Sequence, residues 1–120
     1  MVSGAHAKKF YLEVASNDFV WMLGGPSGNP VTVLSNGARV FPLWSSRTRI
    51  EKIIQTVDGY SQCVVLGNSW TDFEEMWAPH LASDGVLVGV NWSGSNATGY
   101  EMAVELVVDA VRNTRESLAK

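Results

Sequence analysis

A strand that runs directly into a helix limits the folds open to this chain more than any other feature. The passage from strand to helix occurs through Trp44-Ser45-Ser46-Arg47. Ile50 then begins an apolar stripe at i, i+3, i+4 and i+7, which is the spacing of a helix with one buried face. A strand followed at once by such a helix predicts a sheet with helices packed against it.

The same local patterns predict the remaining elements. Apolar residues at helical or alternating spacing give the order α-β-β-β-α-β-α-β-β-α, and the chain is expected to form a single α+β domain over residues 1–120. We predict one mixed or antiparallel sheet with helices packed on it. The predicted helices lie at about 5–16, 46–57, 71–81 and from 104, with a frayed end over about 113–120. The predicted strands lie at 19–23, 31–35, 38–43, 62–66, 86–92 and 98–102, with 62–66 central in the sheet.

Four local signals refine these elements. Asn36-Gly37 predicts a two-residue type I′ hairpin turn, because both central positions of that turn need positive φ. Pro42 lacks a backbone donor, so we expect it at a strand end or on an edge strand. Thr71 and the glutamate three residues later form a capping-box pattern. Pro79 is expected to kink or shorten the helix that contains it.

Composition excludes several classes of protein. The 120 residues are 46% apolar and 18% charged, enough apolar surface for a core without disulfides or metals. The net charge of −3 and the scattered basic residues argue against nucleic-acid binding. No apolar run reaches the ~20 residues of a membrane span, and the N-terminal residues lack the apolar core of a signal peptide. Cys63 stands alone in an apolar run, which fits a buried thiol and a cytoplasmic location.

Several motifs together resemble a known bacterial family. They are the hairpin end at 41–45, the helix Phe73-Glu74-Glu75-Met76-Trp77-Ala78-Pro79-His80-Leu81, and Asp84-Gly85 followed by Val88-Gly89-Val90-Asn91-Trp92. In order and spacing they resemble the family catalogued as domain of unknown function 2750, over roughly residues 19–111. The resemblance implies a single-domain cytosolic α+β protein and carries no established activity, so no catalytic residue follows from it.

The strand-to-helix junction is the first candidate site. A helix N-terminus offers free N–H groups and a positive dipole, and arginine adds a bidentate donor for an anion. The residues involved are Trp44, Ser45, Ser46, Arg47 and Arg49. In the alternative interpretation, the serines only cap the helix, Trp44 packs in the core and the arginines are solvated.

The tryptophans are the second candidate. Five in 120 residues is a high number, and tryptophan suits both interfaces and ligand pockets. Trp70 precedes a capping-box pattern and Trp92 ends a strand, so we expect both to be partly exposed and to contact a partner. Asn91 lies beside Trp92 and joins this candidate surface, although it can instead bond its own backbone at the strand end.

No catalytic or metal-binding set is predicted. His80 lies near Glu75 and Asp84, but Pro79 disrupts their helix and no G-x-S-x-G elbow supplies a nucleophile. His6, His80 and Cys63 lie in separate elements without zinc-site spacing. We therefore expect no metal, no cofactor and no catalytic residue.

Three hypotheses about function follow. The first is a small cytosolic binding module that contacts an unidentified protein partner, in an immunity-like or regulatory role. The second is a small-molecule binder, or an enzyme, for an anionic ligand at the Trp44–Arg49 junction. The third is a homodimer formed through an exposed hairpin edge at 31–35 or 98–102.

Overall fold

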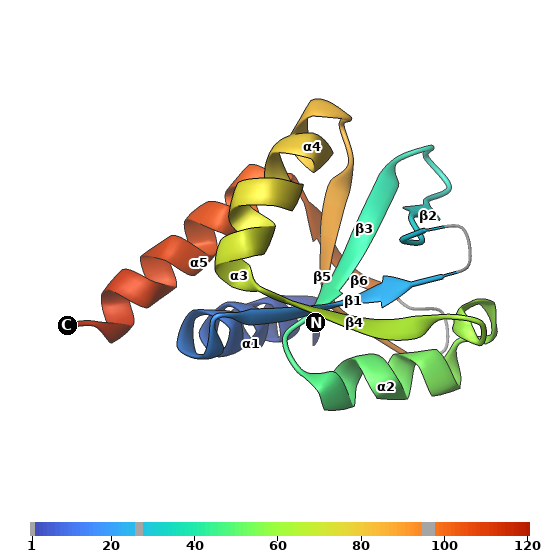
Figure 1. Cartoon of the computed structure of the whole chain (residues 1–120), viewed down its shortest axis with the longest axis horizontal. Coiled ribbons are helices and arrows are strands. Elements are labelled where there is room, and N and C mark those ends of the chain that lie inside the picture. The colour runs from blue at the N-terminus through green and yellow to red at the C-terminus, as the bar shows by residue number, and fades with distance from the viewer. Residues whose placement is uncertain (1, 26–27, 95–97) are drawn as a thin grey trace.

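One mixed β-sheet forms the centre of the molecule, and helices cover both of its faces (Figure 1). The computed structural model describes residues 2–25, 28–94 and 98–120. The strands are β1 (Phe19–Gly24), β2 (Thr32–Val33), β3 (Arg39–Trp44), β4 (Val64–Ser69), β5 (Leu87–Ser93) and β6 (Thr98–Met102). The helical segments are α1 (Val2–Asn17), α2 (Arg47–Thr56), η1 (Asp58–Tyr60), α3 (Trp70–Asp72), η2 (Phe73–Trp77), α4 (Ala78–Ser83) and α5 (Val104–Leu118). The α+β class and the order of the elements confirm the prediction from sequence.

The sheet combines antiparallel pairs with one parallel pair. Its order is β4-β1-β3-β5-β6, and β2 pairs with β3 outside this path. β3 and β5 run parallel, with Val40 opposite Leu87 and Leu43 opposite Val90. The connection between them includes α2, β4 and the helical segment 70–83. Because parallel strands end at the same side of a sheet, the carboxyl ends of β3 and β5 lie next to each other.

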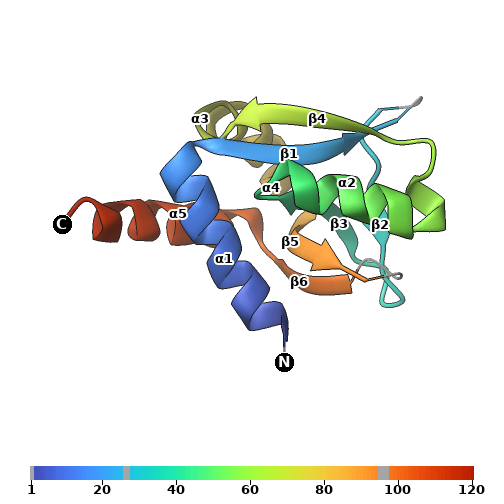
Figure 2. The same cartoon turned by 90° about the horizontal axis from the view of Figure 1, so that it is seen from below.

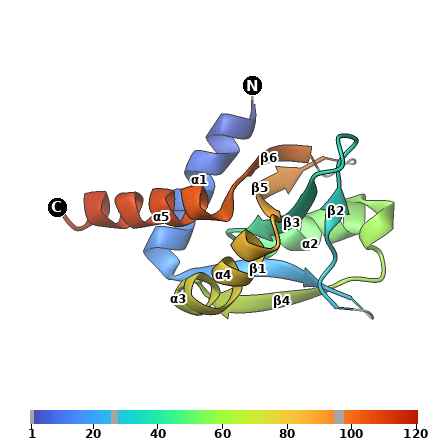
Figure 3. The ribbon, with the colours of Figure 1, turned by 90° about the horizontal axis from the view of Figure 1, so that it is seen from above.

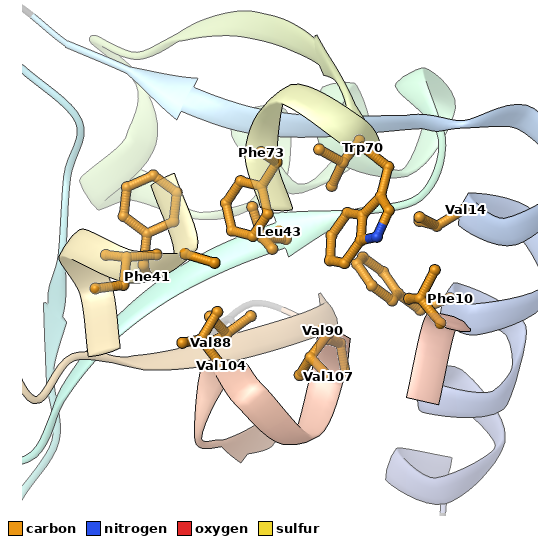
Figure 4. Close-up of a cluster of buried hydrophobic side chains, with 14 of the residues drawn as sticks. Phe10, Val14, Phe41, Leu43, Trp70, Phe73, Val88, Val90, Val104 and Val107 are labelled. Atoms are coloured by element: carbon orange, nitrogen blue, oxygen red, sulfur yellow. The ribbon is translucent and has the colours of Figure 1, made fainter. Parts of the chain in front are cut away.

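The larger core lies on the face covered by α1, the segment α3–η2–α4, and α5 (Figure 4). Phe10 and Val14 of α1 are buried there, as the helical spacing in the sequence predicts. Trp70 stacks on Phe73 with 5.0 Å between ring centroids and meets Phe10 edge-on at 6.2 Å. Such aromatic pairs contribute about 0.5–1.5 kcal/mol beyond the area that they bury.

The smaller core lies under α2, on the opposite face (Figure 2). Ile50 and Ile53 of α2 are buried against Trp44 of β3 and Trp92 of β5. The apolar stripe that predicts this helix is therefore confirmed as its buried face. This second core fixes α2 against the carboxyl ends of the two parallel strands.

β4 forms an edge of the sheet, so the prediction that it is central was wrong. Its apolar run reflects burial on one face, because Val65 packs toward α2 while Val64 and Leu66 on the other face are exposed. Cys63 precedes the strand and is half-buried rather than buried within it. Partial burial raises the pKa of the Cys63 thiol above its ordinary value, since desolvation disfavours the thiolate.

The β2–β3 hairpin has a three-residue loop, so the predicted two-residue type I′ turn was wrong. The N–H of Leu34 donates to the carbonyl of Ala38, and the N–H of Gly37 donates to that of Leu34. Gly37 has a φ of 87°, whereas Asn36 is not among the non-glycine residues with positive φ. The Asn36 side chain instead accepts from the N–H of Ala38 at 2.9 Å. A left-handed glycine after a tight turn is the usual three-residue solution.

Pro42 lies in the middle of the central strand β3, not at a strand end or on an edge strand as predicted. It is paired with Gly89 of β5 on one side. On the other side, residues 39–40 pair with β2 and residues 43–44 pair with β1. Pro42 falls in the gap between these two ladders, where a missing N–H is tolerated.

The helical segment 70–83 begins earlier than predicted. The side chain of Ser69 caps it by accepting from the N–H of Asp72 at 3.1 Å, while the hydroxyl of Thr71 donates to Asp18. The capping box at Thr71 was therefore wrong. Residues 73–77 form a π-helical turn before α4, whose first turn holds Pro79. As predicted, the regular α-helix is interrupted near this proline, which cannot donate a helical hydrogen bond.

α5 continues to Leu118, although its polar composition predicts fraying from about residue 113. Within this stretch the hydroxyl of Thr114 donates to the carbonyl of Ala110, and Arg115 pairs with Asp18 at 3.1 Å. Before α5, the antiparallel pairing of β5 and β6 confirms the predicted hairpin. Most of its turn, at residues 95–97, lies outside the described residues.

Candidate functional site

The candidate site begins where β3 passes into α2. Trp44 and Ser45 are buried, and Ser46 forms the N-cap by accepting from the N–H of Arg49 at 3.3 Å. The indole N–H of Trp44 donates to the carbonyl of Trp92 at 2.8 Å. The end of β3 is thereby joined to the end of β5, its parallel neighbour.

β5 carries a bulge near its carboxyl end, beside the end of β3. Between the pairs Val90↔Tyr100 and Ser93↔Thr98, two residues of β5 lie opposite Gly99 alone. The first of the two, Asn91, has a φ of 51°, a left-handed conformation that asparagine tolerates better than most residues. Bulges of this kind redirect a strand and are common next to functional sites.

Asn91 is the centre of a buried polar network. Its side-chain oxygen accepts from the N–H of Ser45 at 2.9 Å, and its amide nitrogen donates to the hydroxyl of Ser45 at 2.9 Å. The same nitrogen donates to the carbonyl of His6 at 3.4 Å, and the Ser45 hydroxyl donates to a Glu13 carboxylate oxygen at 2.6 Å. The network ties α1 to the ends of β3 and β5. Buried polar groups of this kind cost about 1–3 kcal/mol each when a partner is removed.

A cavity of about 500 Å³ lies beside this network, between α2 and the end of β5, and is called the α2–β5 cavity below. Three of its lining residues carry basic side chains, namely His6, Arg49 and Lys52. No carboxylate is found among the described residues that line it. The complete described lining is His6, Thr48, Arg49, Lys52, Ile53, Thr56, Trp92, Ser93 and Gly94.

The charge of the cavity is partly compensated at one point. The Nε atom of Arg49 lies 3.6 Å from a carboxylate oxygen of Glu13, and both side chains are about one-third exposed. Lys52 is exposed and forms no salt bridge within the described residues. The ammonium of Lys52 is therefore the least compensated charge in the α2–β5 cavity.

The two arginines predicted to act together lie apart. Arg47 lies over the ring of Trp21, 5.7 Å from its centroid, and pairs with Glu51 at 3.0 Å on the exposed side of α2. Arg49 lines the α2–β5 cavity. Residues two positions apart on a helix point in different directions, because each residue advances the helix by about 100°. Of the two, Arg49 lies where an anion in the cavity would be, and Arg47 does not.

The expected exposure of Trp70 and Trp92 was wrong. Trp70 is 1% exposed, because it begins the helical segment and is enclosed by Phe10 and Phe73. Trp92 is 3% exposed, because its indole packs against Gly89, where an added Cβ atom would lie 2.4 Å from the ring. Trp92 still contributes to the wall of the α2–β5 cavity. The two tryptophans thus do not form a shared exposed surface.

Three ionisable residues of the site, Lys52, His6 and Glu13, were not predicted from sequence. Lys52 could have been found, because it follows Thr48 at i+4 on the polar side of the α2 stripe. His6 and Glu13 gave no such signal, since their approach depends on how α1 packs on the sheet. Among the described residues, no group of three or more His, Cys, Asp or Glu side chains is arranged to hold a metal ion.

The fold and the site define a small α+β protein with a basic cavity at the carboxyl ends of its parallel strands. The chain belongs to the family described as protein of unknown function (DUF2750), whose model matches residues 7–110. The match confirms the resemblance and extends it to include most of α1. Comparison with curated proteins finds no match to the chain. No helix among the described residues is both long enough and apolar enough to cross a membrane.

Proposed function

We propose that this protein binds a small anionic molecule in the α2–β5 cavity. One observation carries the proposal: His6, Arg49 and Lys52 line the cavity, with no carboxylate among its described lining residues. A volume of about 500 Å³ falls within the range of small-molecule sites, roughly 300–1,000 Å³. The cavity also lies at the carboxyl ends of parallel strands, where α/β sheets commonly bind ligands.

The lining favours a ligand with an apolar part next to its charge. Ile53 and Trp92 supply apolar wall, while Thr48, Thr56 and Ser93 supply hydroxyl groups. An aromatic or aliphatic body could pack against the apolar wall as its phosphate or carboxylate meets Lys52. Binding of this kind combines apolar burial with a few directed polar contacts.

The buried hydroxyl of the strand-to-helix junction gives no support to catalysis in the cavity. The Ser45 hydroxyl is the buried nucleophilic group nearest in sequence to the junction, but it is committed to Glu13 and Asn91. Ser45 is also absent from the described lining of the cavity. Ser45 therefore supplies no nucleophile to a ligand in the cavity.

Thermal unfolding with a panel of anions tests the proposal. We expect phosphate, pyrophosphate, benzoate or phenyl phosphate to raise the unfolding midpoint at constant ionic strength, because a ligand of the native state stabilises it. Lys52→Ala should lose most of that shift, and Arg47→Ala should keep it, since Arg47 lies outside the cavity. Equal loss in both variants, or no stabilisation by any anion, would contradict the proposal.

A protein partner is a second candidate function, favoured by an apolar cleft on the other face of the sheet. The cleft has a volume of about 530 Å³, and Met76 at its border is exposed. Its described lining is Val31, Phe41, Met76, Trp77, His80 and Leu81. Methionine adapts well to varied binding surfaces. A partner held here should be lost with Met76→Lys and kept with Leu106→Lys, a matched change of an exposed apolar residue on α5.

The cytoplasm is the compartment that we propose. The support is chemical: Cys63 is a free thiol and the sequence holds no second cysteine with which it could pair. Free thiols persist in reducing compartments. Recovery of the native protein from a secreted fraction would contradict this assignment.

A further inference from the structure

The outer side of β4 is an open sheet edge. β4 pairs with β1 through six consecutive residue pairs, and no described strand pairs with its other side. Figures 2 and 3 show the strand along one border of the sheet. Two apolar residues of this strand, Val64 and Leu66, are 58% and 40% exposed.

The backbone of β4 presents unused hydrogen-bonding groups at this edge. The N–H of Trp70 donates to the carbonyl of Asp18 at 3.0 Å, which continues the β1–β4 register by one pair. Hydrogen-bonded and non-hydrogen-bonded residue pairs alternate along an antiparallel ladder. Leu66 therefore belongs to a pair bonded to β1, whereas Val65 and Gly67 direct their N–H and C=O groups outward.

β4 lacks the features that usually protect an edge strand. Proteins protect edges with charged residues, prolines, bulges or very short strands. The sequence Val64-Val65-Leu66-Gly67-Asn68-Ser69 contains no charge and no proline, and its register with β1 has no bulge. The other edges differ, because β2 is two residues long, while β6 includes Glu101 and pairs across the β5 bulge.

We propose that β4 pairs with β4 of a second copy of this chain about a two-fold axis. With Leu66 opposite Leu66 of the second copy, Val65 of each chain faces Gly67 of the other. The outward N–H and C=O groups of those residues can then form ladder hydrogen bonds. The two Leu66 side chains lie side by side as a non-bonded pair, the arrangement in which cross-strand side chains are closest.

Charge along this edge also suits a second copy. The groove between α2 and β4 is lined by Arg47, Glu51, Ile54, Gln55, Cys63, Val64 and Val65. The charged side chains among these described residues, Arg47 and Glu51, have opposite signs. They form an ion pair with each other at 3.0 Å, so this groove presents no block of like charge to a second copy. Two-fold dimers are the commonest homo-oligomers.

Sedimentation of the full chain over a wide concentration range tests this surface. We expect the wild-type chain to sediment with twice the mass of the monomer at high concentration. Leu66→Lys should shift it to monomer, because it places like charges opposite each other across the axis. Leu106→Lys on α5 is the matched control and should stay dimeric. A wild-type chain that is monomeric throughout, or a dimer insensitive to Leu66→Lys, would overturn the proposal.

A cross-link keeps the test decisive if Leu66→Lys fails to fold. In a Cys63→Ser background, Leu66→Cys should give a disulfide-linked dimer under mild oxidation. The expected separation of about 4.5 Å between the Cα atoms of a non-bonded pair suits a disulfide. Leu106→Cys in the same background should remain monomeric on a non-reducing gel. Equal cross-linking of the two variants would also overturn the proposal.

Discussion

At the scale of single residues, Asn91 has the most demanding position in the site. It adopts a left-handed conformation, is buried, and bonds to Ser45 and to the carbonyl of His6. This position requires both a positive φ and a side chain that can form these hydrogen bonds. Glycine adopts the positive φ but has no side chain to bond, and most other residues adopt it only at a cost in conformational energy. The identity of this residue therefore follows from backbone geometry and hydrogen bonding together.

Substitution of Asn91 should separate these two contributions. Asn91→Gly keeps the backbone conformation but leaves the N–H of Ser45 without its acceptor, at an expected cost of about 1–3 kcal/mol. Asn91→Ala adds the strain of a Cβ atom at positive φ and should cost about 1 kcal/mol more. Urea unfolding of both variants measures the difference. An alanine variant as stable as the glycine variant would show that the left-handed conformation is not required.

At the scale of elements, α2 links the junction to the cavity. Ser46 caps its first turn, Ile50 and Ile53 fix its buried face, and Lys52 lies on the side that lines the cavity. The cap, the apolar stripe and the basic residues all fall within twelve residues of sequence, positions 46–57. The cap and the buried face together fix the orientation of α2, and so determine that Arg49 and Lys52 face the cavity.

Removing the cap should weaken this element in a measurable way. Ser46→Ala should lower the free energy of unfolding by about 1 kcal/mol, because the N–H of Arg49 loses its side-chain acceptor. Ser46→Asp should retain most of the stability, since aspartate caps helices as well as serine does. Chemical denaturation of the two variants provides the comparison. If Ser46→Asp lowers the free energy of unfolding as much as Ser46→Ala does, the contribution of Ser46 is not its helix cap.

The elements themselves follow from local patterns in the sequence, but the position of a strand in the sheet does not. The stripe starting at Ile50 predicts α2 because its spacing depends only on neighbouring residues. The run from Cys63 to Leu66 has the same composition whether the strand is central or at an edge. β4 is an edge strand because, among the described strands, it pairs with β1 alone.

The candidate site was predictable in part for the same reason. Arg49 could be selected as an anion ligand because it lies in the first turn of a predicted helix. The participation of His6 and Glu13 depends on the packing of α1, and Asn91 bonds to His6 across 85 positions of sequence. The burial of Trp92 depends on the absence of side chains at Gly89 and Gly99, which come from different strands. Contacts of this kind are set by the tertiary fold rather than by local pattern.

At the scale of the whole molecule, the two faces of the sheet offer different surfaces. The face under α2 holds the basic α2–β5 cavity, and the opposite face holds the apolar cleft beside Met76. The open β4 edge lies between these faces. A small anion, a protein partner and a second copy of the chain would therefore each contact a distinct region. Substitutions in one region can therefore be tested without changing the other two regions.

Amide NMR shifts of the ¹⁵N-labelled protein titrated with phenyl phosphate test the anion site most directly. We expect the perturbed amides to cluster at Thr48–Thr56 and Trp92–Gly94, and we expect uncharged phenol at the same concentration to perturb them far less. Lys52→Ala should weaken the response, and Arg47→Ala should preserve it. Shifts centred on Val31 and Met76–Leu81, or equal shifts with phenol, would contradict the assignment of an anion site to the α2–β5 cavity.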